Sequence, residues 1–210
     1  AMKLPATLSF VDGALVEPLA VGSYGVRQSS MRAGDRVLVL GGGSVALCVI
    51  WQARRRGAGR IVALSRSARR RAMAEAMGAD AFVVQGENDV QAVADALGGS
   101  PRIVFECVGE PGLIGMGLRH VGVFGEVVSL GFCTSPDSFV PAAAAMKGAV
   151  LKFPVGYTLD DFEMSARAME RGHADPKMLV TSVASLEETP ATFERLRAAN
   201  AETKVHVAPG

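Results

Sequence analysis

The sequence predicts an α/β fold: a doubly wound, six-stranded parallel sheet with the strand order 3-2-1-4-5-6, followed by a C-terminal helical return segment. Two observations lead to this prediction. Short runs of apolar, β-branched residues alternate with segments of helical length between residues 29 and 157. The first run, from Arg36 to Leu40, ends in three glycines, and a helix-forming segment begins at Ser44. Strands that alternate with helices form parallel sheets with right-handed crossovers.

The individual elements follow from the apolar pattern and from the residues at each boundary. Before the first strand, one or two short helices are expected between Leu8 and Gln28, with a break near Pro18. Ser67 and Asn88 are suitable N-caps for two of the later helices. Strands are expected at residues 36–40, 61–64, 81–84, 102–107, 125–130 and 150–153. Helices are expected at 44–56, 68–77, 89–97, 111–120 and 141–147.

After Tyr157 the regular alternation ends. Thr158 and Asp161 have the spacing of a capping box, which predicts a helix over residues 159–171. A second helix is expected at 191–199, after Pro190, and a last strand at 204–207 has no evident partner in the six-stranded sheet. The chain is therefore expected to consist of connecting helices (1–28), a central α/β domain (29–157) and a C-terminal segment (158–210).

The composition is typical of a globular protein. Apolar residues make up 49% of the 210, and no apolar run approaches the ~18 residues of a membrane span. No signal peptide is evident, so a cytoplasmic location with no membrane partner is expected. Ala1 before Met2 is typical of a tag remnant, and we hypothesise that the chain was cut from a longer protein. Three scattered cysteines indicate neither a disulfide framework nor a C-x-x-C metal site.

The glycines after the first strand indicate a nucleotide site. Gly41-x-Gly43-x-x-Ala46 fits the dinucleotide fingerprint, in which the third glycine can be alanine. Gly41 allows a sharp turn, Gly43 removes a side chain where the backbone approaches a pyrophosphate, and Ala46 keeps the helix close to the strand. The helix N-terminus, at Ser44 and Val45, is then expected to bind the phosphates through its free N–H groups.

The end of the second strand distinguishes NAD from NADP. An acidic residue there binds the adenosine ribose and favours NAD, whereas an arginine accommodates a 2′-phosphate. This chain has Ser65-Arg66 and no carboxylate at that place. Arg69 to Arg71 oppose the dipole of the next helix by ~0.3–1 kcal/mol each. We therefore expect NADP, with its 2′-phosphate bound by Ser65, Arg66 and Arg70; Arg69 and Arg71 are expected to form a solvated face.

Two further strand ends are expected to border the cofactor, because parallel strands end at one edge of the sheet. These are Cys107-Val108-Gly109 after strand four and Leu130-Gly131-Phe132 after strand five. Glu106, inside strand four, is expected to be a buried structural carboxylate with a hydrogen-bond partner. No catalytic residue can be assigned, and the histidines are expected at the surface: His120, His173 and His206.

Several motifs together resemble a known family. They are Gly13-Ala-Leu-Val-Glu-Pro-Leu-Ala20, Gly34-Asp-Arg-Val-Leu-Val-Leu-Gly-Gly-Gly43, Met77-Gly-Ala-Asp80, Phe105-Glu-Cys-Val-Gly109 and Gly125-Glu-Val-Val-Ser-Leu-Gly131, with the closing Lys204-Val-His-Val207. In this order they closely resemble the cofactor-binding half of the medium-chain, zinc-type alcohol dehydrogenases, particularly the polyol and threonine dehydrogenase branch. The resemblance covers nearly the whole chain. Tyr24 and Ser65 depart from it, since the family usually has a histidine and an acid there.

The resemblance implies hydride transfer between a nicotinamide cofactor and a small-molecule alcohol or carbonyl, with zinc as the Lewis acid. In such enzymes the zinc ligands lie mainly in a preceding domain, and in an intact parent Glu17 would also reach the metal. This chain has no such domain, so it is expected to bind cofactor without catalysing the reaction. The resemblance further implies a homo-oligomer formed through strand six, at 150–153.

Two other classes of protein stay open at this point. A methyltransferase with the same fold also begins with a strand and glycines, although Leu40 and Ser65 occupy places where such enzymes usually have acids. A non-catalytic nucleotide- or RNA-binding protein is suggested by the eight arginines between Arg54 and Arg71. That cluster lacks interleaved aromatic residues, and no nucleic-acid partner is expected.

Overall fold

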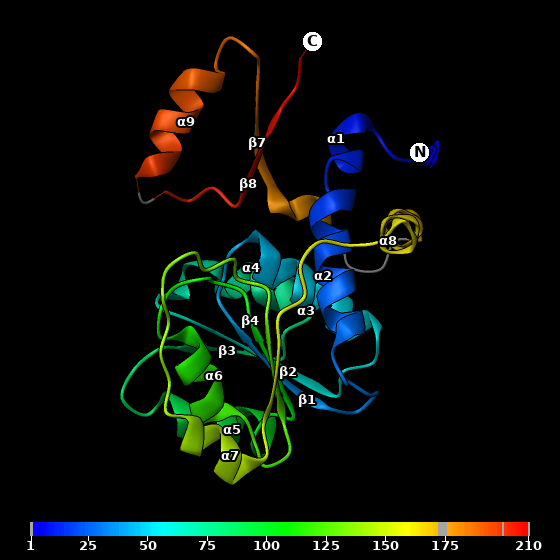
Figure 1. Ribbon diagram of the computed structural model, residues 1–210. Coiled ribbons are helices and arrows are strands. Elements are labelled where there is room, and N and C mark those ends of the chain that lie inside the picture. Colours follow the sequence, from blue (N-terminus) through cyan, green and yellow to red (C-terminus); the bar gives the residue numbers. More distant parts are fainter. Residues whose placement is uncertain (1, 172–175, 199, 210) are drawn as a thin grey trace.

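The computed structural model describes residues 2–171, 176–198 and 200–209. Six parallel strands form one sheet in the order β3-β2-β1-β4-β5-β6, which confirms the predicted topology (Figure 1). Leu40 is in register with Leu64 and Glu106, so β1, β2 and β4 end at the same edge. The strands are β1 Arg36–Leu40, β2 Arg60–Ser65, β3 Ala81–Val84, β4 Ile103–Glu106, β5 Glu126–Ser129 and β6 Val150–Lys152.

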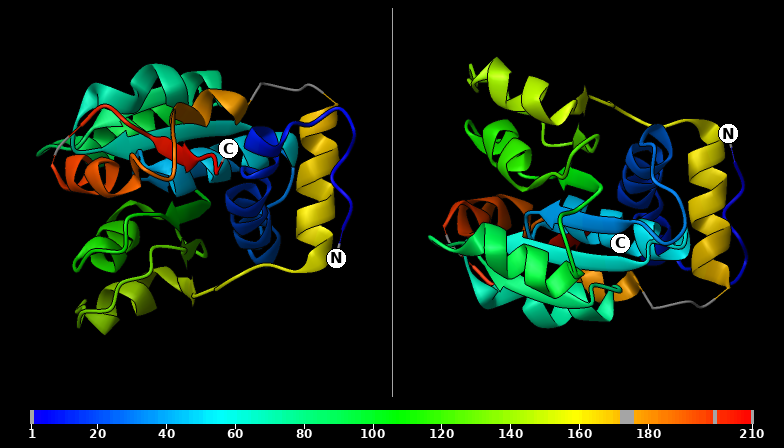
Figure 2. Two further views of the ribbon diagram at one scale, coloured as in Figure 1. Left: turned by 90° about the horizontal axis from the view of Figure 1, so that it is seen from above. Right: turned by 90° about the horizontal axis from the view of Figure 1, so that it is seen from below.

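Helices cover both faces of this sheet (Figure 2). One face carries α2 (Val16–Gln28), α3 (Ser44–Arg55), α4 (Arg71–Ala76) and α8 (Leu159–Glu170). The other carries α5 (Asp89–Leu97), α6 (Leu113–His120) and α7 (Pro141–Lys147). The remaining helices are α1 (Phe10–Gly13), α9 (Thr189–Arg197) and the 3-10 turns Ala68–Arg70 and Pro176–Leu179.

The two faces explain why the strands are apolar without alternation. Successive side chains of a strand point to opposite faces, so Val37 and Val39 pack under α3 whereas Leu38 and Leu40 pack under α5 and α6. All four are fully buried. No helix in the described ranges is long and apolar enough to cross a membrane.

The helix boundaries show which local predictions were right. Two helices lie in the predicted region, but the break between them is at Ala14 and Leu15 and not at Pro18. Pro18 lies in the first turn of α2, where its missing N–H has no helical partner to lose. The predicted caps at Ser67 and Asn88 make no side-chain capping bond. The capping box of Thr158 and Asp161 is confirmed at the start of α8.

The C-terminal segment contains a strand that the sequence did not reveal. β7 (Val180–Ala184) pairs in parallel with β8 (Lys204–Val207), and α9 connects them. The last strand therefore does have a partner, in a two-stranded sheet separate from the main one. In Figure 1 this small unit lies next to α4, above the carboxyl edge of the large sheet.

Candidate cofactor-binding site

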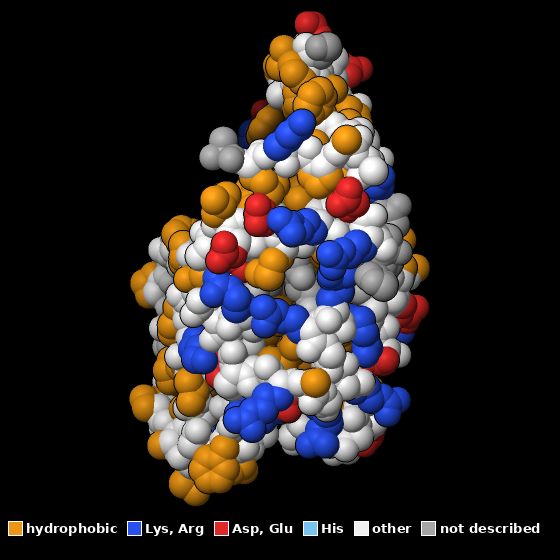
Figure 3. Space-filling view, turned by 90° about the vertical axis from the view of Figure 1, so that its right-hand side faces the viewer, with side chains coloured by type: hydrophobic (Ala, Val, Ile, Leu, Met, Phe, Trp, Pro, Cys, Tyr) orange, Lys and Arg blue, Asp and Glu red, His pale blue; other side chains and the backbone are white. Residues whose placement is uncertain are grey.

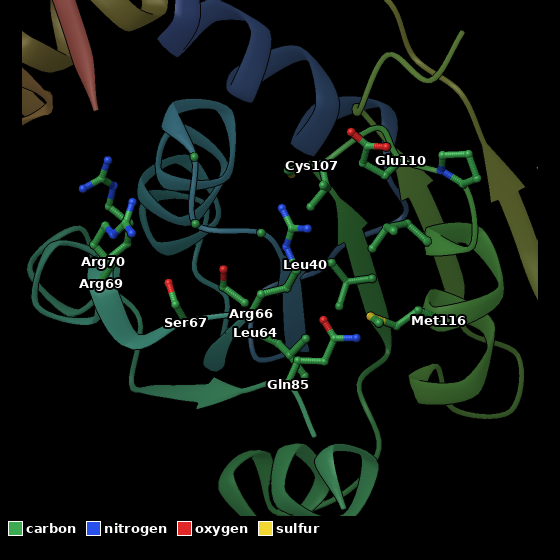
Figure 4. Close-up of a pocket in the computed structure, with 17 residues that line it drawn as sticks. Leu40, Leu64, Arg66, Ser67, Arg69, Arg70, Gln85, Cys107, Glu110 and Met116 are labelled. Atoms are coloured by element: carbon green, nitrogen blue, oxygen red, sulfur yellow. The ribbon is translucent and has the colours of Figure 1, made fainter. Parts of the chain in front are cut away.

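A cavity of about 660 Å³ opens at the carboxyl edge of the sheet, where β1, β2 and β4 end (Figure 4). This is the place at which a doubly wound sheet binds its ligand. Seven of the residues predicted for the site line it: Gly41, Gly43, Ser65, Arg66, Arg70, Cys107 and Val108. The other lining residues are Leu40, Gly42, Leu64, Ser67, Arg69, Gln85, Glu110, Pro111, Leu113 and Met116.

The glycine turn has the conformation that the fingerprint requires. Gly41 has a φ of +119°, and a Cβ on it would lie 3.1 Å from Val108 Cγ2 and 3.5 Å from the Ala46 methyl. Gly43 is the N-cap of α3, and no atom lies within 4 Å of where its Cβ would be. The backbone at the start of a twelve-residue helix is therefore open to the cavity, which suits a phosphate group.

Positive charge lines one side of the cavity. Figure 4 shows Arg66 extending between Arg69 and Arg70 on one side and Cys107 on the other. Among the described residues, none of these three arginines forms an ion pair with a carboxylate. Burial, and then the charge of Arg69, lower the pKa of Arg70, although an arginine stays protonated. The cavity therefore presents positive charge to a ligand from these arginines, although one carboxylate residue, Glu110, also belongs to its lining.

Other members of the arginine cluster form contacts within the chain. Arg54 donates to the carbonyl of Gly78 and pairs with Asp80, and Arg71 donates to the carbonyl of Phe82. Arg69 and Arg71 were predicted to form a solvated face. Both are exposed, but each also donates a hydrogen bond to a backbone carbonyl. On the side shown in Figure 3, basic side chains are scattered among acidic and uncharged ones. Four of the eight arginines on which the RNA-binding alternative depended are therefore hydrogen-bonded within the chain: Arg54, Arg69, Arg70 and Arg71.

Glu106 holds together the loops that follow β4 and β5. Its buried carboxylate accepts hydrogen bonds from the backbone N–H of Val108 (2.6 Å) and Gly109 (2.8 Å) and from Ser129 Oγ (2.7 Å). The predicted structural role is therefore confirmed. A Cβ on Gly131 would lie 2.1 Å from the Gly109 nitrogen, so these two loops touch through their backbones.

Several predicted residues do not line the cavity. Ser44 and Val45 begin α3 beside it, and Gly109 and Gly131 lie in the loop contact behind it. Leu130 packs on Gly25 of α2, and Phe132 is 77% exposed. Some lining residues were not predicted. Leu40, Leu64 and Gln85 lie at or just after the ends of strands at the same edge of the sheet, so their positions in the predicted strands could have indicated them. Met116, inside α6, has no such signal.

Of the cysteines and histidines that the structure describes, only Cys107 lines the cavity. Burial raises the pKa of the Cys107 thiol well above its usual range and that of Cys48 to about 12, so both stay protonated. His120 and His206 are buried, contrary to the surface position expected for them, and burial lowers the pKa of each. His173 lies outside the described residues.

The donor atoms of the described residues do not fit a zinc site. Zinc takes three or four nitrogen, sulfur or oxygen ligands from the protein. Glu17 is exposed in the first turn of α2, and no three His, Cys, Asp or Glu side chains in the described ranges lie close enough together to hold a metal ion.

The fold and the cavity are those of the doubly wound α/β domains that bind dinucleotides. The chain belongs to the zinc-binding dehydrogenase family, whose sequence model matches residues 44–171. This membership confirms the resemblance found in the motifs and decides against the methyltransferase alternative.

Individual relatives agree with the family. The chain is 33% identical over 187 residues to (R,R)-butanediol dehydrogenase of Bacillus subtilis (strain 168), covering 89% of this chain and 54% of that protein. It is 30% identical over 197 residues to sorbitol dehydrogenase of Rattus norvegicus, covering 91% of this chain and 55% of that protein. A zinc-binding dehydrogenase of Sinorhizobium meliloti 1021, crystallised with NADP, superposes with a TM-score of 0.90 at 29% identity, covering 99% and 62%. The chain spans about half the length of the curated relatives it matches.

Proposed function

We propose that this chain is the NADP(H)-binding part of an alcohol dehydrogenase. One observation carries the proposal: Ser65 ends β2 and Arg66 follows it, in the same cavity as the open glycine turn, with no carboxylate at the ribose position. The pyrophosphate would bind at Gly41 to Gly43 and the start of α3, and the 2′-phosphate at Ser65, Arg66 and Arg70. The NADP bound to the Sinorhizobium meliloti relative supports a nicotinamide cofactor of this kind.

In a full-length protein we propose hydride transfer between the nicotinamide and a small alcohol or carbonyl. The names of the butanediol and sorbitol dehydrogenase relatives support this substrate class. Residues 29–157 would be the cofactor domain, and 1–28 and 158–210 would pack on the rest of the protein. Because the described residues do not fit zinc, the chain itself would bind cofactor without catalysing the reaction.

The replacement Arg66→Ala tests the choice of cofactor. We expect it to weaken NADPH binding about 10- to 100-fold, because hydrogen bonds to a charged group contribute about 1.5–3 kcal/mol. NADH has no 2′-phosphate, so its affinity should change less than about twofold. Fluorescence titration of the wild type and the variant with each cofactor measures both affinities.

Arg60→Ala is the matched control, because Arg60 begins the strand that Arg66 follows, is also exposed to solvent and does not line the cavity. It should leave both affinities unchanged. If the wild-type chain bound NADH as tightly as NADPH, the phosphate assignment would be wrong although the dinucleotide site could stand. If it bound neither, the cofactor-binding function itself would be rejected.

We also propose that two copies pair through β6. This strand forms one edge of the sheet; Val150 on it is 48% exposed and the adjoining Phe153 is 64% exposed. An unpaired strand edge with apolar side chains is a ready surface for pairing with another chain. Sedimentation velocity should show a dimer that dissociates in Val150→Lys. Val90→Lys, which replaces a similarly exposed valine on α5, should leave the dimer intact, and a monomeric wild type would rule out the pairing.

A further inference from the structure

The turn formed by residues 200–203 is attached to the arginine side of the cofactor cavity. Arg69 Nη1 donates to the carbonyl of Asn200 at 2.7 Å, and Arg70 Nη1 donates to that of Ala201 at 2.7 Å. Arg70 Nη2 also donates to the carbonyl of Glu202. These bonds join residues about 130 apart in the chain, so the C-terminal segment contacts the cavity wall directly.

Asn200 shapes this turn. Its amide nitrogen donates to the carbonyls of Leu196 (3.3 Å) and Ala198 (2.7 Å), and its amide oxygen accepts from the backbone N–H of Glu202 (2.9 Å). The side chain thereby connects the end of α9 to the residues whose carbonyls face Arg70. Asn200 does not line the cofactor cavity, so it can act on a ligand there only through the arginines.

Arg70 can contact the turn and a phosphate at the same time. A guanidinium carries five N–H donors in a fixed fork, and the carbonyls of Ala201 and Glu202 occupy two of them. Arg70 lines the cavity, and its other N–H donors have no hydrogen-bond partner among the described residues. Carbonyl partners fix the orientation of the guanidinium without neutralising it, and the charge of Glu202 in the same turn also acts on Arg70. A guanidinium held in this way loses less conformational freedom when it binds a phosphate.

We propose that the turn 200–203 positions Arg70 for the 2′-phosphate of NADP(H), so that the preference for NADP over NAD depends on the C-terminal segment. The proposal rests on the proposed function above, and makes Asn200 a positioning residue for cofactor selectivity. Because coupling between two sites is reciprocal, a bound 2′-phosphate also stabilises the docking of the turn.

The test compares four chains: the wild type, Asn200→Ala, Arg70→Met and the double variant. The dissociation constants for NADPH and NADH are measured by fluorescence titration, and the selectivity is their ratio. Asn200→Ala should lower the selectivity about 3- to 10-fold by weakening NADPH binding alone. In the Arg70→Met background, the same replacement should have no further effect on the ratio. Asn88→Ala, at an asparagine that makes no capping bond, is the matched control and should leave the ratio unchanged.

Each other outcome overturns the proposal. An equal loss of affinity for both cofactors would show a purely structural role for Asn200, and no loss would show no role. A gain in NADPH affinity would mean that the carbonyls compete with the phosphate for Arg70. A wild-type chain with no preference for NADPH would instead show that the 2′-phosphate assignment itself is wrong, and this inference would fail with it.

Discussion

Gly131→Ala is expected to destabilise the fold by about 3 kcal/mol or more, because the new methyl group has no space. Its Cβ would lie 2.1 Å from the nitrogen and 2.5 Å from the Cα of Gly109, and 2.6 Å from Glu106 Oε2. The loops after β4 and β5 would have to separate, and the buried Glu106 carboxylate would lose hydrogen bonds to Val108 and Gly109. Urea unfolding followed by circular dichroism measures the loss.

The matched control is Gly115→Ala, in the first turn of α6. The nearest atom to its new Cβ would be 3.9 Å away, and alanine is the better helix former by about 0.5–1 kcal/mol. This variant should unfold at the same or a slightly higher urea concentration. A Gly131→Ala chain as stable as the wild type would show that the two loops separate easily, contrary to the close backbone contact described here.

Asp161→Asn is expected to reduce the free energy of unfolding at pH 7 by about 2 kcal/mol, because it breaks an ion pair between the buried Asp161 on α8 and the partly exposed Arg27 on α2. The Asp161 carboxylate is fully buried; it accepts from Arg27 Nη2 at 2.9 Å, Ser23 Oγ at 3.1 Å and Thr158 Oγ1 at 2.7 Å. An asparagine keeps the shape but not the charge, so Arg27 loses its carboxylate partner. The control is Asp160→Asn, because Asp160 is exposed in the same helix turn. This variant should reduce the free energy of unfolding by at most about 1 kcal/mol.

The same carboxylate gives a pH dependence of known sign. Hydrogen bonds from Arg27, Thr158 and Ser23 outweigh the effect of burial and lower the pKa of Asp161 from 3.8 to about 2. A carboxyl group whose pKa is lower in the folded than in the unfolded state stabilises the fold fully at any pH above its unfolded pKa. This stabilisation is lost as the pH falls toward the pKa of the folded state. The difference in free energy of unfolding between the wild type and Asp161→Asn should therefore be constant above about pH 4 and should become smaller toward pH 2. A difference that grew as the pH fell would contradict the assignment.

The central sheet and the glycine turn were predictable because they depend on residues close together in the chain. A strand buried on both faces is apolar throughout, as from Val37 to Leu40, and a turn that approaches phosphate needs glycine at Gly41 and Gly43. The capping box of Thr158 and Asp161 is local in the same way. These patterns sufficed for the strand order, and for the cavity residues at the ends of β1, β2 and β4.

Other features depend on contacts between distant parts of the chain, and only the tertiary structure decided them. β7 pairs with β8 although α9 separates them in the chain, and neither strand has an apolar pattern that specifies a partner. Arg70 was predicted from its charge, but its attachment to the carbonyls of Ala201 and Glu202 has no local signal. The sequence by itself therefore determined the sheet, its order and the phosphate-binding turn, whose requirements are local. Packing decided which arginines face the cavity and what holds them there, because those contacts join residues more than a hundred positions apart.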